Sequence, residues 1–187
     1  QRNTEDFNLG LHLIVATMPI VLVGLIFSDV IAERTSSIES IAWANLIFAG
    51  LLWFAFKYSP QTKNLVGLTV LAALAVGCLQ ALAIFPGASR SGMAITGALL
   101  IGLNLKESSK FAFLLSIPTI LGALILMVLK DAFVLTADDF MILLTGFIGS
   151  AIIAFLTIKV FLQFVEKIGM TPFVMYRLLL GLALLLV

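Results

Sequence analysis

The sequence predicts an all-α, polytopic integral membrane protein with about five transmembrane helices and one re-entrant helical hairpin. Of its 187 residues, 61% are apolar and only 11% are charged, and the mean hydropathy is +1.18. A soluble domain has about 45–50% apolar and about 25% charged residues. The net charge of +1 gives no reason to expect a nucleic-acid partner, and the single cysteine, Cys78, allows no internal disulfide. We expect one membrane domain over residues 1–187.

Apolar runs separated by short polar segments predict the helices. We expect helices at residues 9–27, 40–56, 65–84, 91–103, 107–129, 139–165 and 172–187. Crossing a bilayer takes about 17–25 apolar residues, and the runs at 9–27, 40–56, 107–129 and 139–165 are long enough. The run at 172–187 reaches the last residue, and the run at 91–103 is too short to span. Because the chain begins at Gln1 rather than Met, we expect it to be a fragment of a longer protein.

The two runs around Pro86-Gly87 predict the hairpin. Proline removes a backbone donor and disfavours helical geometry in the residue before it, so the run at 65–84 should end here. The short run at 91–103 would then lead back to the side from which the chain came. We therefore expect a re-entrant hairpin over residues 65–103 with its tip at 86–90. Non-helical backbone at membrane depth is tolerated where it is buried in protein or lines a cavity, so this tip predicts a polar cavity.

Local residue patterns predict several helix ends. Asn104 and Glu107 have the spacing of a capping box for the helix at 107–129. Thr171 before Pro172 has the pattern of an N-cap followed by the first helical residue. Pro19 and Pro118 lie inside predicted helices, which we expect them to kink.

The basic residues predict the topology, since cytoplasmic loops of membrane proteins are enriched in Lys and Arg. If the N-terminus is cytoplasmic, one side holds Arg2, Lys57, Lys63, Lys106, Lys110, Lys159 and Lys167, and the other holds only Arg34 and Lys130. This orientation places the base of the hairpin on the cytoplasmic side and the C-terminus on the outer side.

Residues 86–92 read Pro-Gly-Ala-Ser-Arg-Ser-Gly and are the most informative part of the chain. A charge at membrane depth is costly and indicates a functional site with a partner. Arginine presents a fork of donors that fits phosphate, and the N-terminus of the following helix also favours an anion. The candidate catalytic residues are Arg90, Ser89 and Ser91. The candidate substrate-binding residues are Gly87, Ala88, Gly92, Thr96 and Gln80.

Other polar residues in the apolar runs leave alternatives open. Arg177 either extends its side chain to the membrane interface or approaches the tip. His12 is interpreted as a hydrogen-bonded residue at a helix contact. Every Asp and Glu lies at a helix end or in a loop. Phosphoryl transfer usually needs a metal held by carboxylates and a base, so the residues at the tip predict the anion-binding half of a site, with no metal ligand in this chain.

The run from Leu79 to Ala123, LQALAIFPGASRSGMAITGALLIGLNLKESSKFAFLLSIPTILGA, resembles the second signature region of the bacterial undecaprenyl-diphosphate phosphatases, the bacitracin-resistance type. The similarity continues through FLQFVEKIGMTPFVMYRLLLG, from Phe161 to Gly181, and covers nearly all of the chain. The core Pro-Gly-x-Ser-Arg-Ser-Gly is highly specific for this family.

The resemblance implies hydrolysis of undecaprenyl diphosphate to undecaprenyl phosphate and phosphate, which recycles the lipid carrier of cell-wall synthesis. It also implies inverted repeats that each contribute a re-entrant hairpin, with both tips at a site open to the outer face of the bacterial inner membrane. Mg²⁺ or Ca²⁺ is the implied cofactor. Arg90 and Ser89 are the implied contacts to the diphosphate. A homodimer is an assembly that the resemblance leaves open.

The chain departs from the family pattern in two places. The family usually has Thr where this chain has Ala94, and Thr96 lies two residues further on. The first signature region of the family, with its metal-binding glutamates and histidine, has no match in residues 1–78. Either the chain is the C-terminal portion of such a protein and lacks the first hairpin and the helix after it, or it is a divergent or degenerate homologue. His12 does not replace the missing ligands.

The sequence is also compatible with two other classes of function. Broken helices whose N-termini face an anion are also used by secondary transporters, so a transporter or flippase of an anionic lipid is the alternative to an enzyme. A non-catalytic chain that needs a partner to complete its site is the third.

Overall fold

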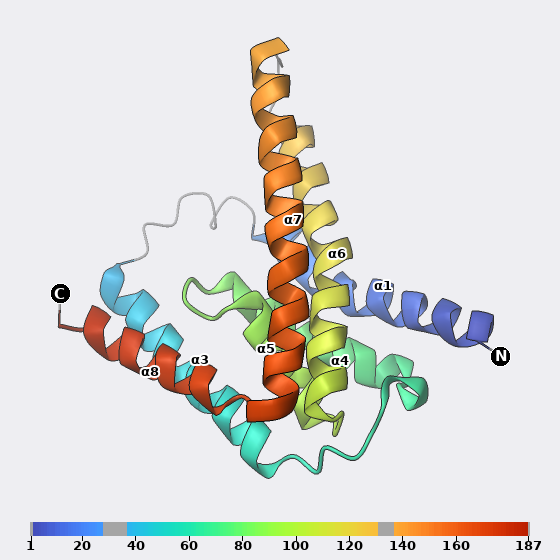
Figure 1. Cartoon of the computed structure of the whole chain (residues 1–187), viewed down its shortest axis with the longest axis vertical. Helices are drawn as coiled ribbons and strands as arrows, with labels where there is room; N and C mark the ends of the chain where they lie inside the picture. The colour runs from blue at the N-terminus through green and yellow to red at the C-terminus, as the bar shows by residue number, and fades with distance from the viewer. Residues whose placement is uncertain (1, 28–36, 131–136, 187) are drawn as a thin grey trace.

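The computed structural model describes residues 2–27, 37–130 and 137–186, and these form helices joined by short loops, with no strand among them (Figure 1). The α-helices are α1 (Arg2–Ile26), α3 (Ile38–Tyr58), α4 (Val70–Ala81), α5 (Arg90–Leu100), α6 (Leu105–Lys130), α7 (Ala137–Ile168) and α8 (Thr171–Leu184), with short 3₁₀ helices η1 (Leu65–Gly67) and η2 (Leu82–Ile84). The segments Glu5–Ile26, Ile38–Tyr58, Leu105–Leu129 and Phe140–Ile168 are long and apolar enough to cross a membrane. The predicted all-α, polytopic membrane fold is confirmed. The run at 172–187 forms α8, which has only 14 residues.

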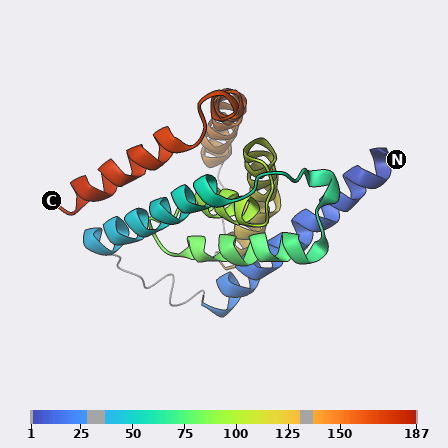
Figure 2. The same cartoon turned by 90° about the horizontal axis from the view of Figure 1, so that it is seen from below.

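The long helices α6 and α7 run side by side and extend beyond the rest of the molecule, as Figure 1 shows. The other helices surround the lower part of this pair: α3 packs against α8, and α1 packs against α4 and α6. Seen from below in Figure 2, the two chain ends lie on opposite sides of the molecule. None of the most apolar part of α7 is buried, so its apolar side chains face outward, as expected of a helix exposed to lipid.

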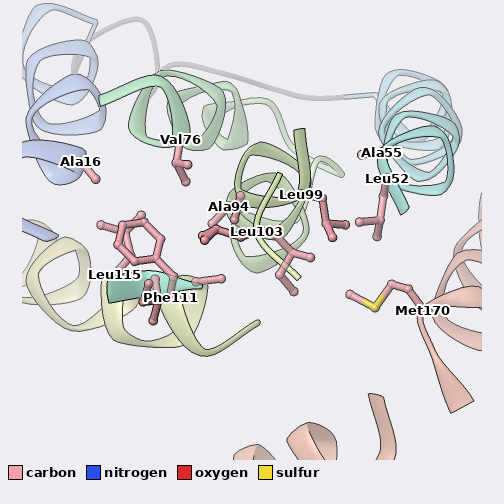
Figure 3. Packing of buried hydrophobic residues seen from close by; sticks show 14 of the residues in the cluster. Ala16, Leu52, Ala55, Val76, Ala94, Leu99, Leu103, Phe111, Leu115 and Met170 are labelled. Atoms are coloured by element: carbon pink, nitrogen blue, oxygen red, sulfur yellow. The ribbon is translucent and has the colours of Figure 1, made fainter. Parts of the chain in front are cut away.

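The short helix α5 occupies the centre of the core. All of its residues from Gly92 to Leu99 are buried. Figure 3 shows Ala94 and Leu99 of α5 among Val76 of α4, Phe111 of α6 and Leu52 of α3. Because α5 is covered by three neighbouring helices, its N-terminus is held in a fixed place.

The predicted hairpin region forms two short helices that pack against each other. The chain leaves helical geometry after Ile84, two residues before Pro86, and α5 begins at Arg90. A Cβ on Gly97 of α5 would lie only 3.1 Å from the Cα of Val76 on α4, so the glycine permits close backbone approach. At 12 and 11 residues, α4 and α5 are both too short to span a bilayer. The re-entrant path through the membrane stays a prediction.

The predicted single helix at 65–84 is wrong in its first part. Residues 65–67 form η1, and α4 begins only after Thr69, whose side chain caps it by accepting a hydrogen bond from the backbone N–H of Ala72 (3.2 Å). Hydropathy alone does not detect this break, because the residues on both sides of Thr69 are apolar. The cap residue was the available signal.

The predicted caps of α6 and α8 have different outcomes. The Glu107 backbone N–H donates to Oδ1 of Asn104 (2.9 Å), so Asn104 caps α6 as predicted. The reciprocal half of the capping box does not form, because the Asn104 N–H donates instead to the carbonyl of Lys63 (3.0 Å). The predicted cap at Thr171 is wrong: α8 begins at Thr171 itself, and Met170 is its N-cap residue without a side-chain bond.

The C-terminal end of α5 is closed by its own backbone. Gly102 has φ +94°, the N–H of Leu103 donates to the carbonyl of Ala98 (3.1 Å) and the N–H of Gly102 donates to that of Leu99 (2.8 Å). This is the Schellman arrangement, which satisfies helix carbonyls that would otherwise lack partners. Lys63 adds to it, since its N–H donates to the carbonyl of Gly102 (2.9 Å).

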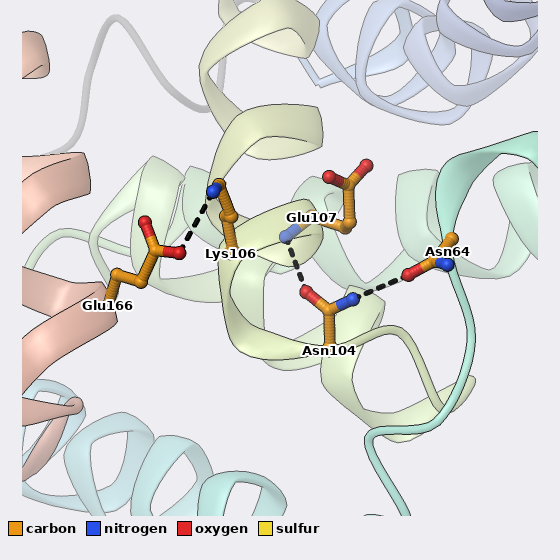
Figure 4. A network of polar contacts seen from close by, with 5 residues as sticks. All are labelled: Asn64, Asn104, Lys106, Glu107 and Glu166. Carbon is orange, nitrogen blue, oxygen red and sulfur yellow. Dashed lines mark hydrogen bonds and ion pairs between the residues drawn. The ribbon is translucent and has the colours of Figure 1, made fainter.

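A polar network extends from this end of α5 (Figure 4). The side-chain amide of Asn104 donates to Oδ1 of Asn64 (2.7 Å), which ties the start of α6 to the segment before η1. Nζ of Lys106 lies 2.9 Å from Oε1 of Glu166 near the end of α7, and both side chains are more than half exposed. The start of α6 is thus joined to the segment before η1 by one contact and to the end of α7 by the other.

Candidate functional site

The tip between η2 and α5 has a backbone that requires glycine at one position. Gly87 has φ +93°, and a Cβ there would lie 2.5 Å from the carbonyl oxygen of Ile41 on α3. The N–H of Ala88 donates to the carbonyl of Phe85 (3.0 Å), which forms a tight turn. The tip is therefore pressed against the backbone of α3, and a side chain at residue 87 would push it away.

Ser89 starts α5 in an unusual conformation. Its φ is +65°, a left-handed value that is uncommon for residues other than glycine. Its Oγ accepts a hydrogen bond from the N–H of Gly92 (3.2 Å), and its carbonyl accepts one from Met93 (3.0 Å). A non-glycine residue is held in such a conformation only where its surroundings impose it, which is characteristic of functional sites.

Arg177 of α8 reaches the tip from the opposite side of α3. One terminal nitrogen, Nη2, donates to the carbonyls of Gly87 (2.8 Å) and Ala88 (3.2 Å). Nε donates to Oδ1 of Asn45 on α3 (2.8 Å), and the side-chain amide of Asn45 donates to the backbone carbonyl of Arg177 (2.7 Å). Of the two alternatives for Arg177, the structure therefore places its guanidinium at the tip.

These groups surround a cavity of about 330 Å³ next to the N-terminus of α5. Its polar lining comes from Asn45, Ser89, Ser91 and Arg177, and its apolar lining includes residues of α7 and α8. The full set of lining residues is Asn45, Leu52, Ser89, Ser91, Gly92, Ile95, Phe161, Met170, Phe173, Tyr176, Arg177 and Leu180. The cavity is thus apolar with a cationic and hydroxyl-bearing end, the composition expected of a site for an amphiphilic anion.

The predicted tip residues divide between the cavity and the tip backbone. Ser89, Ser91 and Gly92 line the cavity. Arg90 is the first residue of α5 and is exposed, and it is not among the lining residues. Gly87 and Ala88 contribute their carbonyls to Arg177. Gly87 and Ala88 therefore contribute to this site by holding the guanidinium of Arg177 through their backbone carbonyls.

Thr96 and Gln80 lie away from the cavity, in the packed interior around α5. The Thr96 hydroxyl donates to the carbonyl of Gly92 in its own helix (2.7 Å). The Gln80 side-chain amide donates to Oγ1 of Thr119 (2.9 Å), and its buried Oε1 has no partner among the described residues. Both side chains are nearly fully buried. Gln80 thus links α4 to α6, Thr96 bonds within α5, and neither residue lines the cavity.

The residues around the cavity do not fit a divalent cation. None of the lining residues is a carboxylate or a histidine, whereas Mg²⁺ and Ca²⁺ prefer oxygen ligands, mainly carboxylates. Within residues 2–27, 37–130 and 137–186, no group of three or more His, Cys, Asp or Glu is close enough to hold a metal ion.

Asn45 was not predicted as a site residue. It is a lone amide in the apolar run at 40–56 and is 6% exposed. A buried polar side chain in an apolar helix must find a partner, and that was the available signal. Its partner could not be named from the sequence because Arg177 lies 132 residues away.

Residues 1–183 match the family of the bacitracin resistance protein BacA. The chain belongs to this family. It is 41% identical to a protein of Alcanivorax borkumensis named undecaprenyl-diphosphatase, over 99% of this chain and 70% of that protein. Proteins with the same name from Saccharophagus degradans and Teredinibacter turnerae are 43% and 42% identical, each over 96% of this chain and 68% of their own length. The predicted family membership is confirmed.

Proposed function

We propose that this chain acts in the hydrolysis of undecaprenyl diphosphate to undecaprenyl phosphate and phosphate, and so recycles the lipid carrier of cell-wall synthesis. Its relatives carry the name of this activity. The observation that carries the proposal is the cavity at the N-terminus of α5, where the Pro-Gly-x-Ser-Arg-Ser-Gly segment meets a cationic side chain and an apolar wall. A lipid diphosphate has the two matching parts, an anionic head and an apolar tail.

The side chains at this cavity bind and orient the diphosphate. The hydroxyls of Ser89 and Ser91 and the guanidinium of Arg177 are donors, and the helix N-terminus adds its positive end. Arg90, the exposed first residue of α5, adds a second guanidinium near this helix N-terminus, and the family resemblance implies that it contacts the diphosphate. Donors fixed in advance around developing negative charge stabilise the transition state of phosphoryl transfer.

A Mg²⁺ or Ca²⁺ ion as cofactor belongs to the proposal through the family resemblance, and when bound it would neutralise charge on the phosphates. The lining residues of the cavity do not fit such an ion, so its ligands would come from other parts of the full-length protein. The roles assigned to Ser89, Arg90, Ser91 and Arg177 do not depend on it.

We also propose the membrane in which this multi-pass protein lies and its orientation there. The distribution of basic residues supports an orientation with the C-terminus on the outer side of the bacterial inner membrane. We also propose a homodimer, for which the unburied apolar surface of α7 offers contact area. The mass of the detergent-solubilised protein, corrected for bound detergent, tests the dimer.

The transporter alternative gains no support from the fold or from these relatives. Radiolabelled lipid phosphate in proteoliposomes separates the two functions. Rapid phosphate release without flux across the bilayer supports the enzyme, and flux without hydrolysis contradicts it.

The first experiment measures phosphate release from undecaprenyl diphosphate in detergent with magnesium or calcium, using this chain and a version that carries its natural upstream residues. Turnover by the longer protein alone indicates that upstream residues complete the site. Turnover by this chain alone, abolished by Arg90→Ala, shows that the tip suffices and that no upstream ligand is needed. Absence of turnover in both, with correctly folded protein, overturns the proposed function.

A further inference from the structure

Arg177 carries a positive charge that the protein does not neutralise. Its partners are the carbonyls of Gly87 and Ala88 and the amide oxygen of Asn45, all of which are neutral. No carboxylate within the described parts of the chain forms an ion pair with it, and its side chain is half-buried in an apolar helix bundle. A charge removed from water without a counter-charge is costly, so such a site is built for an anionic ligand.

The hydrogen bonds of Arg177 leave one terminal nitrogen available. Nε and Nη2 are used by Asn45 and the tip, while Nη1 has no partner among the described residues. Nη1 lies beside the start of α5, only 2.9 Å from the position that a Cβ on Gly92 would occupy. Gly92, Arg177 and Ser89 all line the same cavity, so Nη1 lies where an anion at the helix N-terminus would be.

Asn45 fixes the direction of this guanidinium. It accepts from Nε and donates to the backbone carbonyl of the same residue, Arg177, so it holds both the side chain and the turn of α8 that carries it. An aspartate could accept the same bond, but its charge would cancel that of the arginine. The neutral amide orients the guanidinium and leaves its charge for a ligand.

We infer that Arg177 binds the diphosphate in the cavity by donating through Nη1 to a phosphate oxygen, and that Asn45 is the positioning residue that orients its guanidinium. This inference rests on the proposed function. The ligand class is a phosphate or diphosphate oxyanion attached to an apolar chain. Gly92 is part of the same site, because a Cβ there would lie 2.9 Å from Nη1 of Arg177 and displace it.

The test uses the full-length protein with its natural upstream residues and measures two quantities. One is the affinity for methylenediphosphonate, a non-hydrolysable diphosphate, by calorimetry. The other is kcat and KM on undecaprenyl diphosphate. We expect Arg177→Lys to weaken the binding of methylenediphosphonate by about tenfold or more, because lysine lacks the planar fork of donors and loses a charge-assisted hydrogen bond.

Asn45→Asp and Asn45→Ser form a matched pair that separates charge from orientation. Both variants lose the amide donor to the Arg177 carbonyl, but Asn45→Asp keeps an acceptor for Nε and also neutralises the arginine. It should therefore weaken the binding of methylenediphosphonate about tenfold, while the retained Nε bond keeps hydrogen exchange at residues 85–92 protected. Asn45→Ser leaves the charge of Arg177 in place but holds its guanidinium loosely. It should therefore raise hydrogen exchange at the tip and weaken the binding of methylenediphosphonate less than Asn45→Asp does. Lys167→Gln removes an exposed cation at the end of α7 and should change neither quantity.

The outcomes separate this inference from the proposed function. If Arg177→Lys and both Asn45 variants bind methylenediphosphonate and turn over like the unaltered enzyme, the inference is wrong and the phosphatase function stands. If the unaltered protein binds methylenediphosphonate through Arg177 but releases no phosphate from the lipid, the phosphatase function is wrong and the binding role stands. Should Asn45→Asp fail to fold, Arg177→Lys and Asn45→Ser still decide.

Discussion

The two ends of α5 differ in how their polar groups are paired. The N-terminal end faces a cavity where Nη1 of Arg177 has no acceptor among the described residues. At the C-terminal end, every polar group named above is hydrogen-bonded within the protein. At the first end, Ser89 is held at positive φ and Arg90 is exposed. At the second end, the Schellman turn at Gly102 and the backbone of Lys63 satisfy the helix carbonyls. The same 11-residue helix therefore has one end built for a ligand and one end built for stability.

This contrast makes a general prediction about mutations. Changes at the N-terminal end should lower activity more than stability, because those groups interact with the substrate. Changes at the C-terminal end should lower stability and leave kcat nearly unchanged.

Arg90→Ala in the full-length protein should lower kcat/KM by about 100-fold or more, because the family resemblance implies that this charged donor contacts the diphosphate. The Arg90 side chain is exposed and contributes no packing in the core, so the midpoint of thermal unfolding in detergent should stay unchanged. Phosphate release and a thermal-shift assay check the two halves. Near-normal turnover at normal expression would contradict the role of the motif.

Gly87→Ala should reduce kcat/KM by about tenfold or more and should also destabilise the tip, since a positive φ costs about 1 kcal/mol for a residue with a side chain. The new Cβ would also meet the carbonyl of Ile41, so the tip must move away from α3. The matched control is Gly50→Ala in α3, where a Cβ meets no atom within 4 Å. Equal activity in the two variants would show that the position of the tip does not matter.

The sequence predicted the parts of this site that depend on local chemistry. Pro86 and Gly87 mark the tip, because turn preferences act within a few residues. Asn104 was predicted as a cap for the same reason, and the structure confirms it.

The sequence did not predict the partners that come from distant parts of the chain. The bond between Asn45 and Arg177 depends on how α3 packs against α8, and hydropathy carries no information about which helices meet. Thr96 was predicted to face the cavity because it follows the tip by one turn or more along the helix, but its hydroxyl donates to a carbonyl of its own helix. Gln80 points instead toward Thr119 of α6.

Asn104→Ala tests the C-terminal end of α5 and should lower the free energy of unfolding by about 1 kcal/mol, the usual cost of losing an N-cap. It also removes the bond to Asn64, so Asn104→Asp, which keeps the acceptor for Glu107, isolates the cap from that bond. Thermal unfolding in detergent measures both variants. A loss of kcat larger than the loss of stability would contradict the division between the two ends of α5.

Lys106→Gln should have the smallest effect. Its ion pair with Glu166 joins α6 to α7, but both side chains are more than half exposed, and exposed pairs contribute little to stability because solvent screens them. Glu166→Gln should have the same small effect, and the double variant should be no less stable than either single one if the pair is the whole interaction. Raising the salt concentration should remove the difference from the unaltered protein, because solvent-exposed charges are screened. A large salt-independent loss would instead mean that these side chains stabilise the base of α6 and α7 through packing, and the C-terminal network would then be more extensive than its hydrogen bonds show.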